Sequence, residues 1–523
     1  MNLFKLLKDS GQILDIQKIH LDVEIKGICF DSREVKKGYL FIALEGGSSD
    51  GHKYIANAIE AGACAIIGRR DMRTGNVPYF RIKNPRKAMA HIAAAFNGFP
   101  ARSLTVIGVT GTDGKTTTVN LIYQSLLACG IKAGMISTVN AVIGQESIDT
   151  GFHVTTPESP TIQSLLRKMV DTGITHVVLE TTSHGLDQFR AEACEFDLAV
   201  VTNITHEHLD YHGGYDNYFA AKFKLIEYLQ TTSQKKGVNQ GIAVINSDDI
   251  SHDRILKEIE QQELRGLRLI TYGTSQGTEV NAKNIKMNAD GLIFDIVTPS
   301  GEYNVVSPLI GEYNIHNILA AIASTAVGMN LPMMQVIDGI KNTSYVPGRM
   351  ERIDLGQDFI AIVDFAHTPN ALKVALETAH KLTNGRVIAV FGSAGLRDRQ
   401  KRRMMAAVSA DMADVSILTA EDPRTENLVD ILGEMADEAR LKGAKENKDF
   451  FIIPDRGEAI LEAIRQADTG DLVIACGKGH EQSMCFGEIE YPWDDRTAMR
   501  AALSKVLGIP GPGMPKLPTS ERS

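Results

Sequence analysis

The sequence predicts an α/β protein of three domains followed by a short tail. A chain of 523 residues exceeds what one hydrophobic core holds, and short apolar strands alternate with helices along most of its length. Breaks in this alternation separate a small α/β domain, a central parallel-sheet domain and a C-terminal α/β domain. The expected boundaries are 1–101, 102–345 and 346–507, and the Pro- and Gly-rich residues 508–523 are expected to be disordered.

Bulk composition excludes several classes of partner. A formal charge of −9 disfavours nucleic acid and acidic membrane surfaces, which need a basic protein surface. The six cysteines fall singly, which is typical of a reducing compartment and does not give the spacing of a zinc site. The N-terminus lacks the pattern of a secretory signal, and no run of about 18 apolar residues occurs. We therefore expect a cytoplasmic protein with no membrane insertion.

The first domain alternates short strands with a helix before a linker at 97–103. Polar turns follow two of its strands, at 31–33 and 46–51, and turn chemistry alone would explain both of them. The expected elements are strands over 27–30, 40–44 and 64–67 and a helix over 54–61.

The central domain begins with a phosphate-binding loop. The run 106–110 predicts a buried strand, and a helix is expected from Lys115 onward, with the glycine-rich turn 111–114 between them. Backbone N–H groups in such a turn, together with the helix N-terminus, bind phosphates. Lys115 is placed to neutralise phosphate charge, and Thr116 to bind Mg²⁺. Because Val109 stands where the longer form of the motif has glycine, this is the shorter form, and its expected ligand is a nucleotide.

A second strand of the central domain ends in a carboxylate. The apolar run 174–180 ends at Glu180, and an acidic side chain at the end of a strand beside the phosphate loop is what a nucleotide site uses to hold Mg²⁺. A solvated glutamate is the alternative interpretation. Other elements expected in this domain are strands over 241–245 and 291–296 and a helix over 318–327.

Three histidines follow a strand predicted over 198–204. His208 and His212 have the four-residue spacing of a helical zinc site, and His206 precedes them. However, Gly213-Gly214 leaves little room for a helix, and no cysteine lies nearby. A single histidine beside phosphate-bound Mg²⁺ is therefore the preferred interpretation, and histidines without a ligand are the alternative.

The third domain repeats the alternation after a break at 346–350, where Pro347 and Gly348 predict a hinge. Its strands are continuous apolar runs, as expected for parallel strands covered on both faces, at 360–364, 387–391, 415–419 and 472–476. Loops at the carboxyl ends of such strands bind ligands in open α/β sheets. Here these loops carry cations and carboxylates that suggest chemistry rather than packing, at 364–369, 392–399, 421–424 and 477–481.

Six motifs in this order resemble the Mur ligase family, the ATP-dependent amide-forming enzymes of peptidoglycan synthesis. The motifs are Gly111-Thr-Asp-Gly-Lys-Thr-Thr117, Glu180-Thr-Thr-Ser-His-Gly185, Thr202-Asn-Ile-x-x-x-His208-Leu-Asp210, Gly311-x-x-Asn-x-x-Asn317, Pro347-Gly-Arg-Met-Glu351 and Asp364-Phe-Ala-His-Thr-Pro369. With Asp31-Ser-Arg33 and Gly477-Lys-Gly-His-Glu481, the resemblance narrows to the members that add the third residue of the peptide. It implies a UDP-binding N-terminal domain, a central P-loop ATPase domain and a Rossmann-like C-terminal domain that binds the incoming amino acid.

The resemblance implies roles for individual residues. Lys115, Glu180, His208 and Lys222 match catalytic positions, and Lys222 matches a lysine that is carbamylated in these enzymes to help position Mg²⁺. Thr116, Glu180 and His208 match the Mg²⁺ contacts. The positions that match ATP contacts are Gly111, Thr112, Asp113, Gly114, Lys115, Thr116, Thr117, Asn317, Arg349 and Asp364.

Two substrate sites are also implied. The contacts to the UDP-N-acetylmuramoyl-dipeptide match Ser32, Thr155, Thr156, Thr182, Gln188 and Arg190, whereas the loop 47–49 departs from the family pattern. The amino-acid pocket matches Arg397, Glu421, Asp422, Arg424, Gly477 and Glu481. Arg424 favours diaminopimelate, because it would pair with the extra carboxylate. Asp422 stands where diaminopimelate-adding members usually have an amide. Its negative charge would suit the ammonium of lysine or ornithine, and one of these two amino acids is slightly preferred as the predicted substrate.

The implied reaction activates a carboxylate with the γ-phosphoryl group of ATP and then joins it to an amine through an acyl phosphate, in a monomeric enzyme. Two alternatives remain at this point. A folylpolyglutamate synthetase also joins an amine to an activated carboxylate, but such enzymes begin near the phosphate loop. A nucleotide-binding homologue without catalysis is the second alternative, and the presence of Lys115, Glu180, His208 and Lys222 weighs against it.

Overall fold

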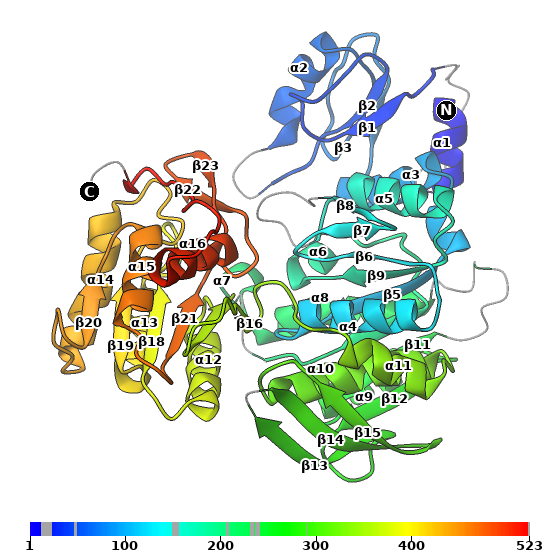
Figure 1. Cartoon of the computed structure of the whole chain (residues 1–523). Coiled ribbons are helices and arrows are strands. Elements are labelled where there is room, and N and C mark those ends of the chain that lie inside the picture. Colours follow the sequence, from blue (N-terminus) through cyan, green and yellow to red (C-terminus); the bar gives the residue numbers. More distant parts are fainter. Residues whose placement is uncertain are drawn as a thin grey trace. The chain divides into compact units, whose positions relative to one another are not determined.

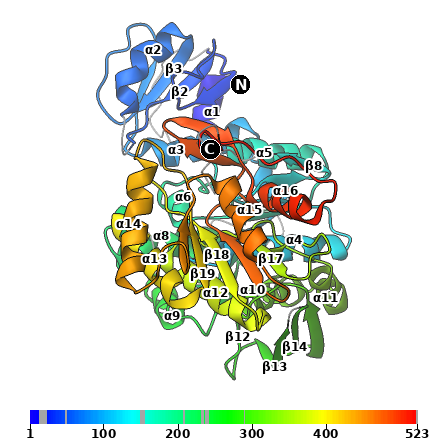
Figure 2. The same ribbon diagram turned by 60° about the vertical axis from the view of Figure 1, so that its left-hand side comes forward.

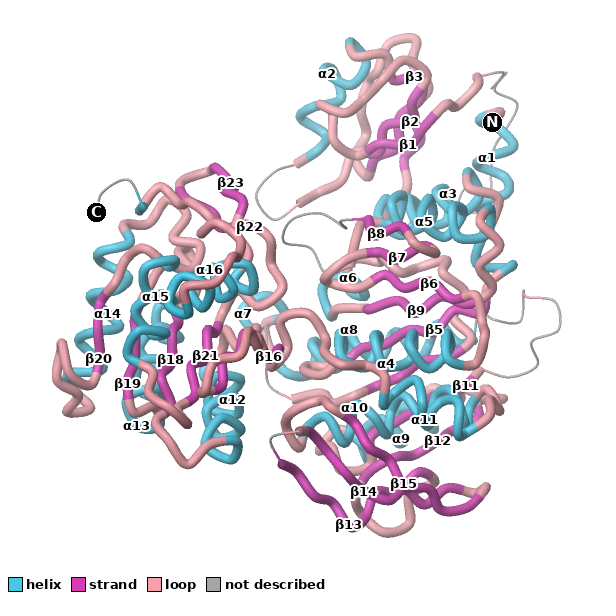
Figure 3. The backbone as a smooth tube through the Cα atoms, viewed as in Figure 1, coloured by secondary structure: helices cyan, strands magenta, loops and turns pink. Residues whose placement is uncertain are grey.

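The computed structural model describes residues 1–11, 23–46, 50–148, 156–205, 209–230, 235, 241–288 and 290–520. The chain forms two compact units, each an alternation of strands and helices (Figure 1, Figure 3). The N-terminal unit comprises Met1–Ala282, Val297–Gly301 and His316–Gly339. The C-terminal unit comprises Lys283–Ile296, Glu302–Ile315 and Ile340–Ser523. Three parallel or largely parallel sheets with helices around them confirm the predicted α/β class.

The first sheet of the N-terminal unit is parallel throughout, in the order β1-β2-β3-β4. Leu40, Ile42 and Ile67 point to the face covered by α1 and α3, whereas Phe41 and Ile66 point to the face covered by α2. The elements are α1 (Leu3–Ser10), β1 (Gly27–Cys29), β2 (Tyr39–Ile42), η1 (Gly51–Tyr54), α2 (Ile55–Glu60), β3 (Ala63–Gly68), β4 (Tyr79–Arg81) and α3 (Pro85–Phe96). The strands and helix predicted here are confirmed, and the predicted linker contains the short helix η2 (Pro100–Ser103).

The second sheet places the phosphate-loop strand β5 (Thr105–Thr110) between β10 (Leu198–Val201) and β9 (His176–Glu180), all three parallel. Along the sheet the order is β12-β11-β10-β5-β9-β6-β7-β8. Because parallel strands end at a common edge, the loops after β5, β9 and β10 meet there. The remaining strands are β6 (Ala133–Ile136), β7 (Ala141–Ile143), β8 (Glu146–Ile148), β11 (Ile242–Asn246) and β12 (Arg268–Gly273).

Helices cover both faces of this sheet. They are α4 (Lys115–Ala128), α5 (Ser159–Asp171), α6 (Ser183–Asp187), α7 (Leu209–His212), α8 (Tyr215–Glu227), α9 (His252–Gln261), α10 (Tyr313–Ile322), the π-helical turn η4 (Ala323–Gly328) and α11 (Met333–Lys341). The short helix α7 ends directly before Gly213-Gly214, so the little room expected for a helix in this segment holds a single turn. Among the described residues, no helix is both long and apolar enough to cross a bilayer.

Three further strands lie in the sequence between β12 and α10. They are β13 (Val280–Asn288), β14 (Gly291–Thr298) and β15 (Gly301–Ser307). β13 pairs with β12 through Val280 and Asn281, and β14 and β15 follow it in the strand order. Only β14 was predicted, because alternating polar residues in its neighbours hide their apolar pattern.

The C-terminal unit is built on a sheet in the order β16-β17-β21-β18-β19-β20, in which only β16 is antiparallel to its neighbour. Helices α12, α13 and α14 lie on one face and α15 and α16 on the other (Figure 2). The strands are β16 (Glu351–Arg352), β17 (Ile360–Asp364), β18 (Val387–Phe391), β19 (Val415–Leu418), β20 (Phe450–Ile452), β21 (Leu472–Cys476) and the hairpin β22 (Ser483–Phe486) and β23 (Ile489–Pro492). The helices are α12 (Pro369–Leu382), α13 (Arg399–Met412), α14 (Leu428–Leu441), α15 (Arg456–Gln466) and α16 (Asp495–Leu507).

The chain beyond α16 is packed rather than disordered as far as residue 520. Leu517 is 3% exposed and joins the core under α15 and α16. The hydroxyls of Thr519 and Ser520 donate to the Asp455 carboxylate at 2.8 and 2.7 Å. The prediction of a disordered tail is therefore wrong for these residues, because composition did not reveal that one leucine and two hydroxyls have partners.

The predicted hinge segment 346–350 is packed into the C-terminal unit. Gly348 has φ +63°, and a Cβ there would lie 2.2 Å from the backbone of Gly479 and His480. Its N–H donates to Glu351 at 2.9 Å, and the N–H of Met350 donates to Asp364 at 2.7 Å. Pro347-Gly348 is thus held by neighbouring residues in this conformation, and hinge motion about these two residues stays a prediction.

Candidate nucleotide and substrate sites

The phosphate loop lies between β5 and α4, as predicted. Gly114 is the N-cap of α4 with φ +79°, and a Cβ at that position would lie 2.2 Å from the Asn317 amide oxygen. A side chain is therefore excluded both by backbone conformation and by Asn317. The ammonium of Lys115 donates to the carbonyls of Gly111 at 2.9 Å and Thr112 at 2.7 Å, so it lies over the loop itself.

The loop after β10 fastens the phosphate loop. The hydroxyl of Thr202 donates to the carbonyl of Asp113 at 2.6 Å, and the N–H of Asp113 donates to the amide oxygen of Asn203 at 2.9 Å. Thr202 also excludes a side chain from Gly111, where a Cβ would lie 1.8 Å from its hydroxyl. The Thr-Asn pair quoted from the sequence thus positions the loop that binds phosphate.

Thr116 and Glu180 meet at the edge of the sheet, as predicted. The hydroxyl of Thr116 donates to both carboxylate oxygens of Glu180, at 3.0 and 3.1 Å. The N–H of Thr138 donates to the same carboxylate at 3.0 Å, a contact that the sequence did not suggest. A hydroxyl and a buried carboxylate are oxygen ligands of the kind that Mg²⁺ prefers.

Lys222 points from α8 to the phosphate loop although the sequence pattern alone suggested a solvated helix face. It is 2% exposed, and its Nζ donates to the carbonyl of Gly111 at 2.5 Å. The ring of Tyr218 lies 4.7 Å from this Nζ, and its hydroxyl lies 2.9 Å from that of Thr112. Lys222 and Lys115 therefore both donate to the carbonyl of Gly111 in the loop that is expected to bind phosphate.

The histidine predictions are only partly covered by the described residues. His206 and His208 lie outside them. His212 is buried within an aromatic cluster, with its ring centroid 4.7 Å from Tyr211 and 5.4 Å from Tyr218. His184 stacks at 4.0 Å from Tyr211. The described part of this segment therefore packs rings together, and the role expected of His208 stays a prediction.

Four of the predicted contacts to the UDP-muramoyl-dipeptide come together near the ends of β9 and α6. The hydroxyls of Thr156 and Thr182 lie 3.1 Å apart. Arg190 donates to the carbonyl of Thr156 at 2.8 Å and to the side-chain oxygen of Gln188 at 2.9 Å. Arg190 also pairs with Glu158 at 3.1 Å. The fifth contact, Thr155, and the loop 47–49 lie outside the described residues.

A cavity of about 520 Å³ lies at the first sheet, and three cations and one carboxylate are among the residues that line it. Its lining residues are Leu44, Glu45, Arg69, Lys83, Asn84, Pro85 and Arg86. Arg86 lies 3.4 Å from Glu158, the residue that also pairs with Arg190, so the cavity and the Thr156 cluster share a carboxylate. Ser32 does not line this cavity and lies in a turn capped by Asp31, whose carboxylate accepts from the N–H of Arg33 at 2.9 Å.

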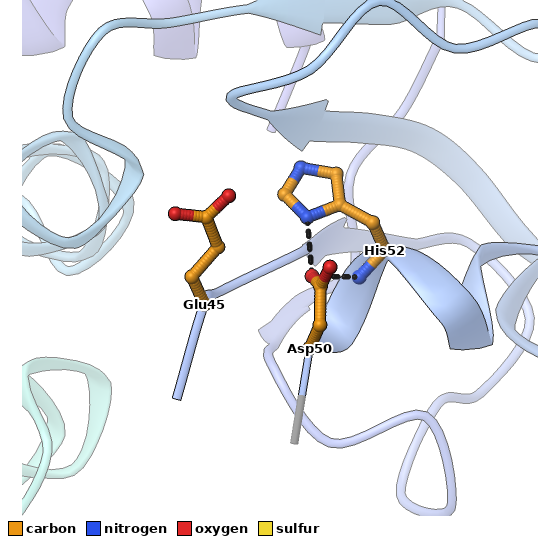
Figure 4. Close-up of side chains that lie close together, drawn as sticks. All are labelled: Glu45, Asp50 and His52. Atoms are coloured by element: carbon orange, nitrogen blue, oxygen red, sulfur yellow. Dashed lines mark hydrogen bonds and ion pairs between the residues drawn. The ribbon is translucent and has the colours of Figure 1, made fainter. Parts of the chain in front are cut away.

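Glu45, Asp50 and His52 lie close together beside this cavity (Figure 4). Nδ1 of His52 lies 2.7 Å from Asp50, and Nε2 accepts from the N–H of Arg69 at 3.0 Å. Arg70 pairs with Glu45 at 3.1 Å and with Asp50 at 2.9 Å. Since both ring nitrogens and both carboxylates are already bound, this cluster is an ion-pair network and not a metal site.

The carboxylate of Asp364 binds backbone N–H groups and is therefore not free. Its two oxygens accept from the N–H groups of Met350 at 2.7 Å and Ala366 at 2.8 Å. Burial raises the pKa of Asp364, and nearby Arg349 opposes that shift. The guanidinium of Arg349 stacks over Phe365 at 4.4 Å. The predicted nucleotide contacts Arg349 and Asp364 are therefore neighbours that fix the loop after β17.

The predicted amino-acid pocket is assembled from the loops after β18, β19 and β21. The loop 392–397 runs against 421–426: the N–H of Gly395 donates to the carbonyl of Asp422 at 2.9 Å, and that of Leu396 to Glu426 at 2.8 Å. Arg397 is exposed and Arg424 is half-buried, and no ion pair of either is found within the described residues. These two guanidinium groups are therefore available to bind anionic groups of a ligand.

Asp422 does not face a ligand with a free charge. It is 6% exposed, and its Oδ1 accepts from Lys478 Nζ at 3.0 Å and from the N–H of Cys485 at 2.9 Å. Lys478 also pairs with Glu481. Lys478 was given no role from the sequence, although its spacing of three residues from Glu481 on a turn is a signal that could have suggested the pair.

Glu421 is buried where the sheet ends. Burial raises its pKa to about 7, against the effect of Lys401, Arg456 and Lys478. A Cβ on Gly477 would lie 2.5 Å from its Oε2, so glycine is required there. Arg456, fully buried, pairs with Asp495 at 2.6 Å and donates to the carbonyls of the neighbouring strand ends. Glu421 and Gly477 are thus buried against each other at the carboxyl end of the sheet.

Comparison with known proteins gives matches along most of the chain. The Mur ligase family catalytic domain matches residues 24–97, the Mur ligase middle domain matches 109–325, and the Mur ligase glutamate ligase domain matches 348–479. A UDP-N-acetylmuramyl-tripeptide synthetase of Roseiflexus sp. is 39% identical and covers 92% of this chain and 95% of its own. A UDP-N-acetylmuramoyl-L-alanyl-D-glutamate--2,6-diaminopimelate ligase of Bacillus licheniformis is 38% identical, and the match covers 93% of this chain and 96% of the relative.

Solved structures share the fold. One described as a UDP-N-acetylmuramoyl-L-alanyl-D-glutamate--2,6-diaminopimelate ligase has a TM-score of 0.66 at 29% identity, over 94% of this chain and 98% of its own. The MurF ligase of Thermotoga maritima in complex with ADP has a TM-score of 0.57 at 20% identity, and the match covers 87% of this chain and 94% of that chain. The second likeness concerns the fold alone.

Proposed function

The chain belongs to the Mur ligase family of ATP-dependent amide-forming ligases, and from this premise we propose that it adds a diamino acid to UDP-N-acetylmuramoyl-L-alanyl-D-glutamate. The observation that carries the proposal is the phosphate loop, where Lys115 and Lys222 bind one carbonyl beside the Thr116–Glu180 pair. A folylpolyglutamate synthetase is less well supported, because the relatives above match across a complete domain that precedes this loop.

The residues present suit ATP and Mg²⁺. The loop 111–114, Lys115 and the N-terminus of α4 would hold the phosphates, with Asn317 beside Gly114. Thr116 and Glu180 would hold Mg²⁺, and the prediction adds His208. The metal would supply charge neutralisation between two anions. Because the reaction consumes ATP, we place it in the cytoplasm. We further propose that the enzyme is a monomer.

The proposed reaction needs alignment rather than a nucleophilic side chain. The γ-phosphoryl group moves from ATP to the side-chain carboxylate of the D-glutamyl residue, which gives an acyl phosphate and ADP. The amine of the incoming amino acid attacks this acyl carbon, loses a proton, and inorganic phosphate leaves. Lys115 would neutralise the transferred phosphoryl group, and the Thr202–Asn203 pair would keep the loop in place.

We also propose that Lys222 is carbamylated and in that form helps to position Mg²⁺. The buried Nζ suits this change, because a carbamate nitrogen keeps one hydrogen and so retains the bond to the carbonyl of Gly111. We expect Lys222→Ala to lose ligation and to regain part of it with added short carboxylic acids, measured as phosphate release. The absence of any response to these acids would argue against the carbamate.

The UDP-muramoyl-dipeptide is assigned to the N-terminal unit. The cationic cavity beside the first sheet suits the diphosphate, and the Thr156–Thr182–Gln188–Arg190 cluster suits the muramoyl-dipeptide. Glu158 supports this assignment, because it pairs with Arg86 of the cavity and with Arg190 of the cluster.

For the amino acid we propose diaminopimelate. The slight preference for lysine or ornithine assumed that the negative charge of Asp422 is unpaired. In the structure, however, Asp422 forms an ion pair with Lys478. Two guanidinium groups, Arg397 and Arg424, suit a ligand with two carboxylates, whereas lysine and ornithine have one. The relative named as a diaminopimelate ligase supports the same choice.

The test supplies UDP-N-acetylmuramoyl-L-alanyl-D-glutamate, ATP and Mg²⁺ with diaminopimelate, lysine or ornithine in separate reactions. We expect ligated product and inorganic phosphate with diaminopimelate at a kcat/KM at least about tenfold above the others. Preference for lysine would overturn the amino-acid assignment. Nucleotide binding without product from any of the three would favour the catalytically inactive homologue instead.

A further inference from the structure

Lys478 is an ammonium enclosed between two carboxylates in the loop after β21. Its side chain is 0% exposed, and its Nζ lies 3.0 Å from Asp422 and also pairs with Glu481. The side chain of Asp422 is 9% exposed, whereas that of Glu481 is 28% exposed. Burial acts to lower the pKa of Lys478, but Glu481 and Asp422 raise it above its usual value, so the ammonium stays charged.

The ion pair of Asp422 and Lys478 affects the charge that a bound amino acid would meet. With Lys478 ionised, the charge of the buried Asp422 is compensated, and the carboxylate of this cluster that stays more exposed is that of Glu481. Without Lys478, Asp422 would be a buried, uncompensated anion one residue from Pro423 and two from Arg424. Such an anion would repel a second carboxylate of the amino acid and attract an ammonium.

The loop keeps other anchors that do not depend on Lys478. The N–H of Cys485 donates to Asp422, that of Arg424 to the carbonyl of Cys485 at 3.0 Å, and that of Gly487 to the carbonyl of Arg424 at 2.7 Å. Asp422 and Arg424 have φ of +39° and +54°, a conformation that non-glycine residues adopt only when the surroundings enforce it. The hairpin of β22 and β23 supplies that enforcement, so a change at Lys478 alters charge while these backbone bonds remain.

We propose that Lys478 is a specificity-determining residue of the amino-acid site, which cancels the charge of Asp422 and thereby lets Arg424 select an amino acid with a second carboxylate. Lys478 acts through Asp422 and through the position of Glu481, and does not itself contact the ligand. This inference rests on the proposed function.

The experiment measures kcat/KM for diaminopimelate and for lysine and follows their ratio in three variants. Lys478→Met leaves a net negative charge, and we expect the ratio to shift towards lysine by at least about tenfold. Asp422→Asn makes the cluster of Asp422, Lys478 and Glu481 less negative by one charge, so the ratio should shift the other way. The double variant Lys478→Met/Asp422→Asn has the same net charge as the wild type, and its ratio should return to within about threefold of the wild-type value.

A second buried pair provides the control. Lys235 lies 2.6 Å from Asp197 in the N-terminal unit, with side chains 3% and 8% exposed. The variant Lys235→Met/Asp197→Asn removes a comparable pair, and it should leave the amino-acid ratio unchanged even where the thermal midpoint falls. Equal losses for both amino acids in Lys478→Met, with no restoration of the ratio by Asp422→Asn, would overturn the inference. A wild-type chain that ligates neither amino acid would instead overturn the proposed function, and the inference with it.

Discussion

At the scale of single residues, the decisive property of each charged side chain is whether it has a partner. Lys115 donates to two backbone carbonyls of the phosphate loop, whereas Lys478 is enclosed by carboxylates. A lysine that binds carbonyls keeps its full positive charge available to an anion. One that is paired with carboxylates contributes position and neutrality instead.

The first prediction concerns Lys115. Replacing it with methionine removes a positive charge from the phosphate loop, and we expect kcat to fall by about 10²–10³-fold because transition-state charge is no longer neutralised. Phosphate release that depends on the UDP-muramoyl-dipeptide measures this. Lys132→Met, at an exposed lysine beyond the same helix, is the control and should leave kcat unchanged. Normal turnover by Lys115→Met would remove the phosphate-loop assignment.

The second prediction concerns Glu421, whose pKa is raised by burial to about 7 from its ordinary value of 4.5. Between these values the unfolded chain releases the proton while the folded chain keeps it, so this residue makes the free energy of unfolding fall as pH rises from 4.5 to 7. Above pH 7 its contribution is constant.

Glu421→Gln should abolish that fall. Relative to the wild type, the variant should gain up to about 3 kcal/mol in free energy of unfolding between pH 4.5 and 7.5. Urea unfolding at several pH values measures the gain, and comparison with the wild type cancels the other titrating groups. A difference that does not change with pH would mean that Glu421 ionises normally.

At the scale of elements, the sequence pattern predicted the buried parallel strands best and missed the short, partly exposed hairpins. The runs that became β5, β9, β17, β18 and β21 are continuous and apolar, since both faces of these strands are covered. The hairpins β7–β8 and β22–β23 are short and partly exposed, so no apolar run marks them. The candidate site followed the same rule: strand-end loops were found, but the partners that fix them were not.

Those partners come from distant parts of the chain. Thr138 contacts Glu180 from 42 residues away, and Lys478 contacts Asp422 from 56 residues away. No local pattern encodes such pairs, because they depend on which strands become neighbours. The tail was missed for the same reason, since Leu517 is a core residue only where α15 and α16 leave a place for it.

The third prediction tests the tail. Ending the chain at Gly508 exposes the surface that Leu517 covers and removes two hydroxyl bonds to Asp455. We expect the free energy of unfolding of the C-terminal unit to fall by about 1.5–3 kcal/mol. Calorimetry measures the change as a lower midpoint for one transition. Leu517→Ala should reproduce most of it, whereas Lys516→Ala, at an exposed neighbour, should not; equal effects of the two would show that the tail contributes nothing by packing.

At the scale of the whole molecule, a net negative chain binds anionic substrates by collecting cations locally. The formal charge is −9, yet Arg69, Lys83 and Arg86 line one cavity, and Arg397 and Arg424 lie on the loops that are proposed to bind the amino acid. Each collection lies within a single unit of the structure, the cavity in the N-terminal unit and the pocket in the C-terminal one. Binding of the two substrates should therefore be separable by mutation.

The last prediction uses this separation. Arg86→Met removes a cation from the cavity but leaves Glu158 paired with Arg190, so we expect KM for the UDP-muramoyl-dipeptide to rise about tenfold. KM for the amino acid and kcat should stay within about threefold, because the loss is one of uniform binding. Arg424→Met should show the reverse pattern, with only the amino-acid KM rising. Initial rates with each substrate varied in turn measure all of these constants. If either variant raised both KM values alike, the two substrates would not be bound by the separate groups of residues assigned to them.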